Sequence, residues 1–511
     1  MGRVVPEDAS GVPAELWSNY RFRPVLTPPG GTLKTIQKSA KLANVLYDIR
    51  GPIMDAARQM EDEGQKIIKL NLGNLAVFGF DAPEEIQQDM IRNLPNSAGY
   101  SDSKGIFAAR KAVMHETQKQ GIAGVTLARQ YCGLGLATCL IDAQAGPGRL
   151  TSAHAGAITH PPVGRTASKL HTIALGAFHL VVEDWQDRWQ ERGVFLQSKP
   201  NASFDQAALS EKLQQLGIGP DTGQLISSLT AQDRFGIKRS GIWFPSAGSI
   251  NLGRLCEDLV QQSPGLYTVW ERTVARIQKE NGIWLAFDQK GDLLQRAHTV
   301  ILANAFGAQD LLSPFGTHLF LKPVRGQLSI FGLAKNSKLL HQLPKTIISG
   351  EGYCLPPRYD IQQQCYRWLV GSTYDEQDDC LEPRAISDHH NLQLAKGILA
   401  PTELKIDELR PIDQFVGLRC VTKDRLPIIG ALPQLENIYV AAALGSRGLL
   451  WSTLASYVIP ALSHSSAFAL DRLARFGLGA DLLTSLSPTR FFAGALASNS
   501  KPIFPPSPRA R

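Results

Sequence analysis

Apolar runs long enough to form buried strands occur mainly in the second half of the chain. Thr299–Ala303 and Ile438–Leu444 are nearly continuous apolar runs, which predict strands covered on both faces. A helix is predicted directly after the second run, from Leu449 to about Leu462. A buried strand that leads into a helix is typical of the α/β class.

Other periodic stretches predict further elements of both kinds. Helices are expected at Leu170–Arg188 and from Asn251 through Leu259. Alternating patterns predict strands at Tyr267–Ile277 and Gly282–Phe287, which meet at a turn.

The strand Ile438–Leu444 ends in the turn Gly445-Ser446-Arg447-Gly448-Leu449, which opens the predicted helix. Glycines let backbone amides approach a ligand closely, and a helix N-terminus favours negative charge. The alternative is an ordinary tight turn without a ligand. A flavin would suit such a turn.

A second candidate ligand site follows the apolar strand that ends at Asp142. An acid at the end of the second strand of a Rossmann-type unit binds a ribose hydroxyl, and Asp142 is the predicted ribose ligand. The alternative is an acid that caps the next turn.

The glycine fingerprint that should precede this acid is not recognised. A G-x-G-x-x-G loop and a helix should lie roughly 20 residues upstream. Gly133-Leu134-Gly135 is too close to Asp142 to leave room for that helix. We therefore expect the first strand, the glycine loop and the first helix to be missing, and FAD to bind weakly or not at all.

The run Gly417–Gly430, together with Ile438–Leu449, resembles the closing segment of glycine-oxidase-like and D-amino-acid-oxidase-like flavoproteins. It is most similar to the C-terminal oxidase half of the bifunctional tRNA-modifying proteins MnmC, which Leu486–Phe491 also matches. The resemblance implies FAD as cofactor. It also implies an α/β fold in which a Rossmann-like FAD-binding domain, lacking its first βα unit, is interleaved with an α+β substrate domain built on an antiparallel sheet.

The resemblance also assigns site residues. Arg419 would hold the substrate carboxylate and is the expected catalytic residue, and strands near Gly352–Pro357 and Leu369–Tyr374 would place Tyr353 and Tyr374 on the substrate side. The residues expected to contact the cofactor are Asp142, Ser152, Gly156, Ala157, Gly445, Ser446, Arg447, Gly448 and Leu449.

The N-terminal part has a different character. Ile53–Glu63 and Asp81–Glu85 predict helical segments, and Lys66–Leu70 a short strand. The block as a whole resembles the start of alanine-synthesising pyridoxal-phosphate (PLP) aminotransferases, through Tyr47–Pro52 and Leu72-Gly73-Asn74. That resemblance stops near Leu127, and no counterpart of the Schiff-base lysine follows, so PLP is not expected.

These observations divide the chain into four parts: a disordered leader (1–34), an aminotransferase-like fragment (35–127), the oxidoreductase (128–495) and a disordered tail (496–511). Within the oxidoreductase, FAD-binding parts are expected at about 133–165, 240–320 and 415–465, and substrate parts at about 166–239 and 321–414.

Composition limits the setting rather than the chemistry. Lys and Arg exceed Asp and Glu by 53 to 46, a net charge of +7 that would help a polyanion such as tRNA to bind and equally fits an ordinary basic surface. The seven cysteines include no C-x-x-C pair, and no stretch is apolar enough to span a membrane. We expect a cytoplasmic protein without a metal site, in which His154 and His160 are exposed loop residues.

Three functions follow as expectations. The first is FAD-dependent oxidation of a C–N bond next to a carboxylate, which would convert carboxymethylaminomethyl-uridine to aminomethyl-uridine at the tRNA wobble position. The second is oxidation of a free amino acid, as in glycine or D-amino-acid oxidases. The third is an inactive chimeric protein without bound flavin.

Overall fold

The computed structural model of the chain describes residues 59–61, 63–65, 84–93, 121–200, 202–399, 406 and 409–492. The chain forms two compact units, residues 1–100 and 101–511. In the first unit, α2 (Glu84–Asn93) begins within the predicted helix start. The helix expected at Ile53–Glu63 is seen at residues 59–61, and the strand expected at Lys66–Leu70 lies outside the described residues.

The second unit contains short parallel strands in two separate sheets. β1 (Thr138–Ile141) pairs in parallel with β6 (Leu266–Val269). β10 (Val300–Leu302) pairs in parallel with β19 (Ile438–Ala442), which also pairs antiparallel with β18 (Ile428–Ala431). All five residues of β19 are buried, as its continuous apolar run predicts.

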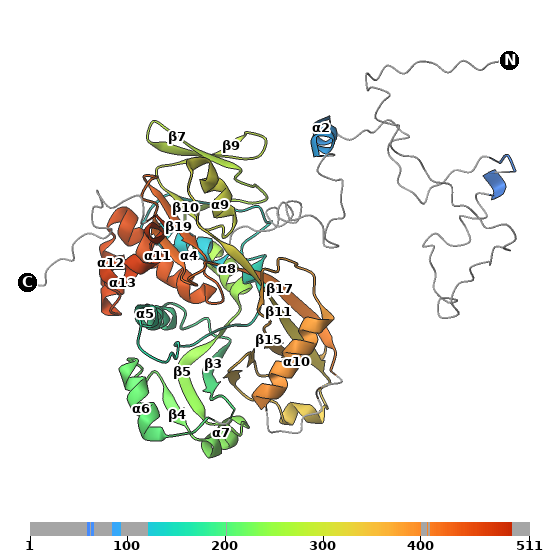
Figure 1. Cartoon of the computed structure of the whole chain (residues 1–511), viewed down its shortest axis with the longest axis vertical. Helices are drawn as coiled ribbons and strands as arrows, with labels where there is room; N and C mark the ends of the chain where they lie inside the picture. The colour runs from blue at the N-terminus through green and yellow to red at the C-terminus, as the bar shows by residue number, and fades with distance from the viewer. Residues whose placement is uncertain are drawn as a thin grey trace, which may run out of the picture. The chain divides into compact units, whose positions relative to one another are not determined.

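Four helices pack together beside these strands. α11 (Gly448–His464) contacts α4 (Ile122–Gly133) and α5 (Lys169–Asp184), and α4 also contacts α8 (Leu252–Gln261). α4, α8 and α11 lie side by side in Figure 1. The helices predicted after Leu449, at Leu170–Arg188 and through Leu259 are confirmed as α11, α5 and α8.

α4 corrects one expectation from the sequence. The first helix of the nucleotide-binding unit was expected to be missing, yet α4 runs directly into the turn before β1, and it buries eight residues. Residues 94–120, which precede this part of the chain, lie outside the described residues. The helix of the first nucleotide-binding βα unit is therefore present, as α4.

A small antiparallel sheet consists of β7 (Arg276–Glu280), β8 (Ile283–Phe287) and β9 (Leu293–Ala297). It forms the top of the second unit in Figure 1. The single strand predicted at Tyr267–Ile277 is wrong, because the chain breaks there into β6 and β7. Glu271 adopts a positive φ of 57° at the break.

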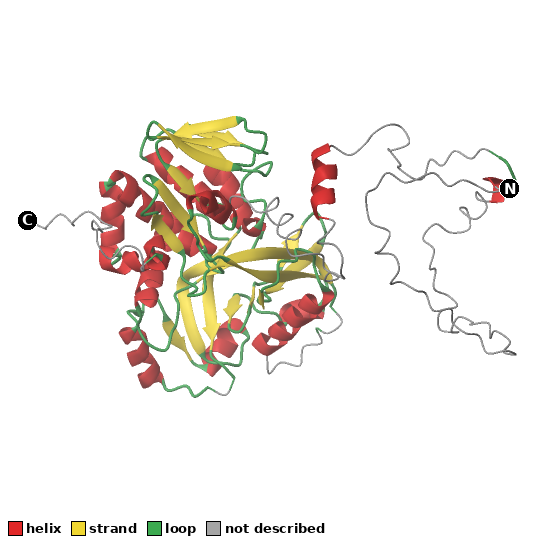
Figure 2. Cartoon of the chain, turned by 45° about the horizontal axis from the view of Figure 1, so that its top comes forward, coloured by secondary structure: helices red, strands yellow, loops and turns green. Residues whose placement is uncertain are grey.

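The remaining strands form one large, mostly antiparallel sheet, as expected for the substrate domain. Figure 2 shows its strands as a curved layer. Its strands are β2 (Ala157–Thr159), β3 (Glu191–Gln197), β4 (Gln224–Ile226), β5 (Gly241–Ile250), β11 (Lys322–Leu333), β12 (Ile347–Ser349), β13 (Tyr353–Cys354), β14 (Arg358–Asp360), β15 (Cys365–Gly371), β16 (Asp375–Glu376) and β17 (Pro411–Val421).

The remaining helices pack around these sheets or follow α11 near the end of the described residues. They are α6 (Gln206–Gln215), α7 (Ser228–Phe235), α9 (Gly307–Leu312), α10 (Ala385–Leu399), α12 (Ala467–Arg475) and α13 (Ala480–Leu483), with 3₁₀ turns that include η5 (Thr151–Ala153). The mixed α/β architecture with an antiparallel second sheet confirms the predicted fold class. The four-part division of the chain stays a prediction.

Candidate active site

Arg419 lies on β17, opposite β11 in the large sheet. One guanidinium nitrogen, Nη1, donates to the carbonyl oxygens of Arg325 (3.3 Å) and Thr373 (3.1 Å), and Nη2 donates to the hydroxyl of Ser372. The space beside the guanidinium exists because residue 326 is glycine: a Cβ there would stand 2.1 Å from Nη1. The backbone of the sheet thus fixes the orientation of this cation.

No carboxylate of the described part of the chain lies within 4 Å of the Arg419 guanidinium. Burial lowers the pKa of Arg419 from its ordinary value, although Tyr353, Tyr374 and Asp375 act in the opposite direction. The ring of Tyr374 lies 5.3 Å from Arg419 and 5.3 Å from Arg425. Unlike Arg419, Arg425 has a carboxylate partner, because it forms an ion pair with Glu376 at the surface. Arg419 is therefore a positioned cation able to accept an anionic ligand.

His154 and Tyr353 lie close to this cation. The sequence analysis expected His154 and His160 to be exposed loop residues, and this is wrong: both side chains are only partly accessible, and burial lowers the pKa of each to about 4. His154 packs against the ring of Phe415, with 5.4 Å between centroids, and its Nδ1 is buried without a hydrogen-bond partner among the described residues. The Tyr353 hydroxyl donates to the carbonyl of Gly156 at 3.1 Å, and burial raises the pKa of Tyr353.

The turn η5 connects the Arg419 strand to helix α4. Thr151 Oγ1 donates to the carbonyl of Leu418, next to Arg419, at 3.1 Å. The hydroxyl of Ser152 accepts from the backbone N–H of Ile122, the first residue of α4, at 3.1 Å. The predicted cofactor residue Ser152 therefore lies between the substrate-side cation and a helix N-terminus.

The turn Gly445–Arg447 leads from β19 into α11 and faces the same region. Gly445 has a φ of +57°, and its N–H donates to the carbonyl of Cys420 at 3.0 Å. A Cβ added to Gly448 would stand 3.8 Å from the side chain of Ile122. The N-terminal ends of α11 and α4 are thus neighbours, and two helix N-termini with their dipoles suit the phosphates of a dinucleotide.

Asp142 follows β1 and is 2% exposed. Its Oδ1 accepts from the backbone N–H of Gln144 at 2.9 Å, so the carboxylate also fixes the local turn. Gly121 and Gly124, at the start of α4, precede Asp142 by 21 and 18 residues. This spacing fits the second half of a Rossmann fingerprint followed by its ribose acid.

These observations test whether the residues suit FAD. Two adjacent helix N-termini, the serine turn and the acid after β1 meet the needs of phosphates and a ribose. Gly156 allows close packing, since a Cβ there would stand 2.9 Å from side-chain atoms of Leu355 and Leu369. The residues therefore fit a dinucleotide. The residues directly before Gly121 lie outside the described part of the chain.

Residues 120–460 match the family model of the DAO family, described as FAD dependent oxidoreductase. The chain belongs to this family. Its members are FAD-dependent oxidoreductases, so the predicted enzyme class and cofactor are confirmed. The assignments of individual site residues stay predictions.

Curated relatives match the two parts of the chain separately. The chain is 26% identical over 408 residues to the tRNA 5-methylaminomethyl-2-thiouridine biosynthesis bifunctional protein MnmC of Cupriavidus necator, covering 74% of this chain and 60% of that protein. It is 51% identical over 111 residues to the glutamate-pyruvate aminotransferase AlaA of Escherichia coli K12, covering 22% of this chain and 27% of that enzyme. The chain therefore spans only part of each relative.

Solved structures agree on the fold. Glycine oxidase from Geobacillus kaustophilus aligns with a TM-score of 0.56 at 20% identity, covering 71% of this chain and 96% of that one. L-Proline dehydrogenase from P. horikoshii aligns with a TM-score of 0.56 at 14% identity, covering 74% and 98%. At these identities the likeness shows the fold alone.

Several residues of the region were not identified from the sequence. Gly121 and Gly124 could have been found from their spacing to Asp142, whereas nothing near Ser372 in the sequence signals its contact with Arg419. Among the described residues, no helix is long and apolar enough to cross a membrane, and no group of three or more His, Cys, Asp or Glu side chains is placed to hold a metal ion.

Proposed function

We propose that the chain oxidises a C–N bond next to a carboxylate and that Arg419 holds the carboxylate. The observation that supports this most is a guanidinium fixed by three acceptors, with no acid partner among the described residues. A guanidinium in this state binds a carboxylate through paired, charge-assisted hydrogen bonds. FAD, when bound, supplies the hydride acceptor.

The protein side chains would then position the substrate rather than react with it. Arg419 would fix the carboxylate, while Tyr353 and Tyr374 limit the space around it. His154 stays neutral near pH 7 because burial lowers its pKa to about 4, so it adds no second cation. Holding the substrate carbon in one orientation is the main protein contribution to such an oxidation.

For the substrate we propose the carboxymethylaminomethyl group of a wobble uridine in tRNA. This group is a secondary amine that carries an acetate arm. Removing two electrons from its N–CH₂ bond gives an imine, and water then releases glyoxylate and leaves aminomethyl-uridine. The name of the MnmC relatives and the net charge of +7 support a tRNA partner. A tRNA substrate would place the chain in the cytoplasm.

The alternative substrate is free glycine or another small amino acid. The fold likeness to glycine oxidases favours it, and the chemistry at Arg419 would be the same. Incubation of the FAD-supplemented chain with carboxymethylaminomethyl-modified tRNA, and separately with glycine, distinguishes the two. Glyoxylate and aminomethyl-uridine from tRNA would support the proposal, while glyoxylate from glycine alone would assign the alternative.

Substitution of Arg419 tests the shared part of both hypotheses. Arg419→Ala should lower kcat/KM by roughly a hundredfold, since the loss of a charge-assisted bidentate contact costs about 3 kcal/mol. Flavin content should be unchanged. Arg425→Ala is the matched control, because Arg425 contacts the same Tyr374 ring but already has Glu376 as partner. Equal turnover of wild type and Arg419→Ala would show that Arg419 is structural.

A further inference from the structure

Tyr374 lies beside the candidate active site and is open to solvent. It directly precedes β16, and 41% of its surface is exposed. The centre of its ring lies 5.3 Å from the guanidinium carbon of the partly buried Arg419. Its hydroxyl accepts a hydrogen bond from Arg425 at 2.8 Å, and Arg425 is itself paired with Glu376. Because the hydroxyl already has a partner, the ring is the part of Tyr374 that can contact a ligand.

Lys322 lies on the same face of the large sheet as Arg419. In β11, Val324 pairs with Arg419 of β17 and with Glu376 of β16. Residues that pair directly share a face of the sheet, and so do residues two apart in one strand. Lys322 stands two residues before Val324, roughly 7 Å along the strand, and its side chain is exposed. Within the described part of the chain, no acid pairs with Lys322.

Lys423 lies in the loop that follows β17, and the segment Leu486–Phe491 fixes this loop. Arg490 of that segment donates through Nε to Asp424 at 2.9 Å, and Asp424 also accepts a backbone N–H of the loop at 3.0 Å. Asp424 is therefore neutralised, whereas Lys423 is exposed and has no acid partner among the residues described. The hydrogen bond to the Tyr374 hydroxyl comes from the same loop, so Lys423 lies near that ring.

The proposed substrate has a length that brings its base to this ring. In carboxymethylaminomethyl-uridine, four bonds separate C5 of the base from the carboxylate carbon, a span of roughly 5 Å. When Arg419 holds the carboxylate, the base therefore stands next to the Tyr374 ring, whose centre is 5.3 Å from the guanidinium. The phosphates on either side of this nucleotide then lie on the exposed side, where Lys322 and Lys423 are uncompensated cations.

We propose that the uracil of the substrate nucleotide packs on the exposed ring of Tyr374, and that Lys322 and Lys423 contact its flanking phosphates. Stacking on an aromatic side chain is a common way in which proteins hold an unpaired base, and it needs no hydrogen bond from the residue. The inference rests on the proposed function, because it takes a tethered base as the substrate. It would make the chain prefer such a nucleotide over free glycine, which reaches Arg419 but leaves the ring uncovered.

The test measures binding of an anticodon stem-loop RNA to the full chain by fluorescence anisotropy. The wobble uridine carries an arm in which oxygen replaces the nitrogen, so that no C–N bond of the arm is available for oxidation. We expect Tyr374→Ala to weaken binding at least about tenfold, the size of the effect of losing one stacked base. Tyr374→Phe should bind within about threefold of the wild type, since the ring is kept. Tyr359→Ala is the matched control, because Tyr359 is also 41% exposed and lies 5.7 Å from a cation, Lys335.

An RNA without the wobble base separates stacking from phosphate contacts. With an abasic nucleotide at that position, the wild type and Tyr374→Ala should bind equally, because there is no base to stack. Lys322→Ala and Lys423→Ala should weaken the binding of both RNAs alike. Each should also reduce the slope of log Kd against log salt concentration by about one, as expected for the loss of one phosphate contact.

The outcomes also separate this inference from the proposed function. If Arg419→Ala weakens binding and Tyr374→Ala does not, the carboxylate site stands and the base contact is refuted. If Tyr374→Ala weakens binding and Arg419→Ala does not, the base contact stands and the assignment of Arg419 is wrong. An equal loss in Tyr374→Ala with the abasic RNA would also refute the base contact. No saturable binding of either RNA by the wild type would overturn both.

Discussion

Two helix starts of the second unit face the same region: Gly121 before α4, called the first corner here, and the turn Gly445–Arg447 before α11, the second corner. In the second corner, β19 is paired on both sides and passes through Gly445–Arg447 into α11. In the first corner, α4 begins at Ile122 directly after Gly121, and its first amide is bound by Ser152. A helix begins at both corners, so both can present backbone amides and a favourable dipole to a phosphate. In the second corner, the paired strand β19 fixes where the amides point.

The largest expected effect comes from placing a β-branched segment and further glycines directly before α4. Replacing Ala112–Gln120 with a β-branched run that ends in Gly-x-Gly should raise the FAD affinity by roughly a hundredfold, since the pyrophosphate would gain backbone amides at a fixed position. Visible flavin absorbance per chain measures the effect. A replacement of equal length rich in Gly and Ser is the control. Full FAD content in the unaltered chain would contradict the expectation that it binds FAD weakly.

The first corner should also make stability depend on pH through His154, which follows the turn η5. Burial lowers its pKa from 6.5 to about 4, so the unfolded chain binds more protons between these pH values. The free energy of unfolding should therefore be highest above pH 6.5, and the His154 contribution should lower it by about 3 kcal/mol as the pH drops to 4.

Denaturant unfolding at a series of pH values measures this effect. His154→Asn should flatten the profile in part, leaving the parallel contribution of His160, whose pKa is also about 4. His389→Asn, at an exposed position of α10, should leave it unchanged. If the pH dependence of the unfolding free energy is the same in His154→Asn as in the wild type, His154 does not cause it.

A smaller effect separates the glycines that begin the two helices. A Cβ on Gly121 would stand 2.4 Å from the Ser152 hydroxyl, whereas a Cβ on Gly448 meets nothing closer than 3.8 Å. Gly121→Ala should therefore displace Ser152 and cost about 1–2 kcal/mol through the lost hydrogen bond to Ile122. Gly448→Ala should be close to neutral. Thermal unfolding of both variants gives the comparison, and equal melting temperatures would mean that the serine contact contributes nothing.

The smallest expected effect is none, and it concerns the block at 35–127. PLP added to the chain should form no internal Schiff base and support no alanine–pyruvate exchange, because no counterpart of the required lysine follows the block. Borohydride reduction followed by mass spectrometry tests this. A stoichiometric adduct at one lysine would show that the block has an active role.

The sequence predicted the second corner more completely than the first. Ile438–Leu444 and the helix after Leu449 stand out because apolar residues continue through both, and the glycine turn separates them. α4 was missed because its first residues were assigned to the aminotransferase-like block and because three glycines were sought. Only Gly121 and Gly124 occupy the fingerprint positions, and Lys119 stands where the first glycine would be.

Other differences depend on contacts between distant residues. The break between β6 and β7 has no glycine or proline to mark it, because Glu271 itself adopts the positive φ. The burial of His154 depends on Phe415, which is far away in the sequence. Arg419 was identified through the family resemblance, but its lack of an acid partner among the described residues is visible only in the folded chain.

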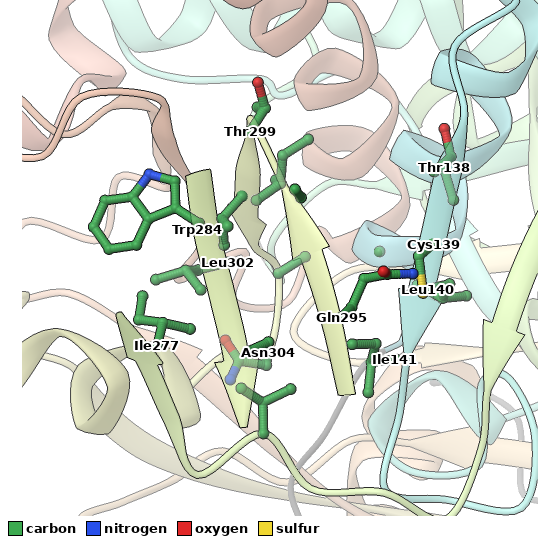
Figure 3. Close-up of a pocket in the computed structure, with 18 of the residues that line it drawn as sticks. Thr138, Cys139, Leu140, Ile141, Ile277, Trp284, Gln295, Thr299, Leu302 and Asn304 are labelled. Carbon is green, nitrogen blue, oxygen red and sulfur yellow. The ribbon is translucent and has the colours of Figure 1, made fainter. Parts of the chain in front are cut away.

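The elements that pack beside β1 and β10 also affect the solubility of the chain. Unpaired strand edges at a protein surface pair with those of other molecules and lead to aggregation. Here α4 and the β7–β9 sheet both line the space beside β1 and β10 (Figure 3). We therefore expect these elements to hinder edge-to-edge association through β1 or β10, so that the chain stays dispersed at concentrations where an open edge of the same composition would precipitate.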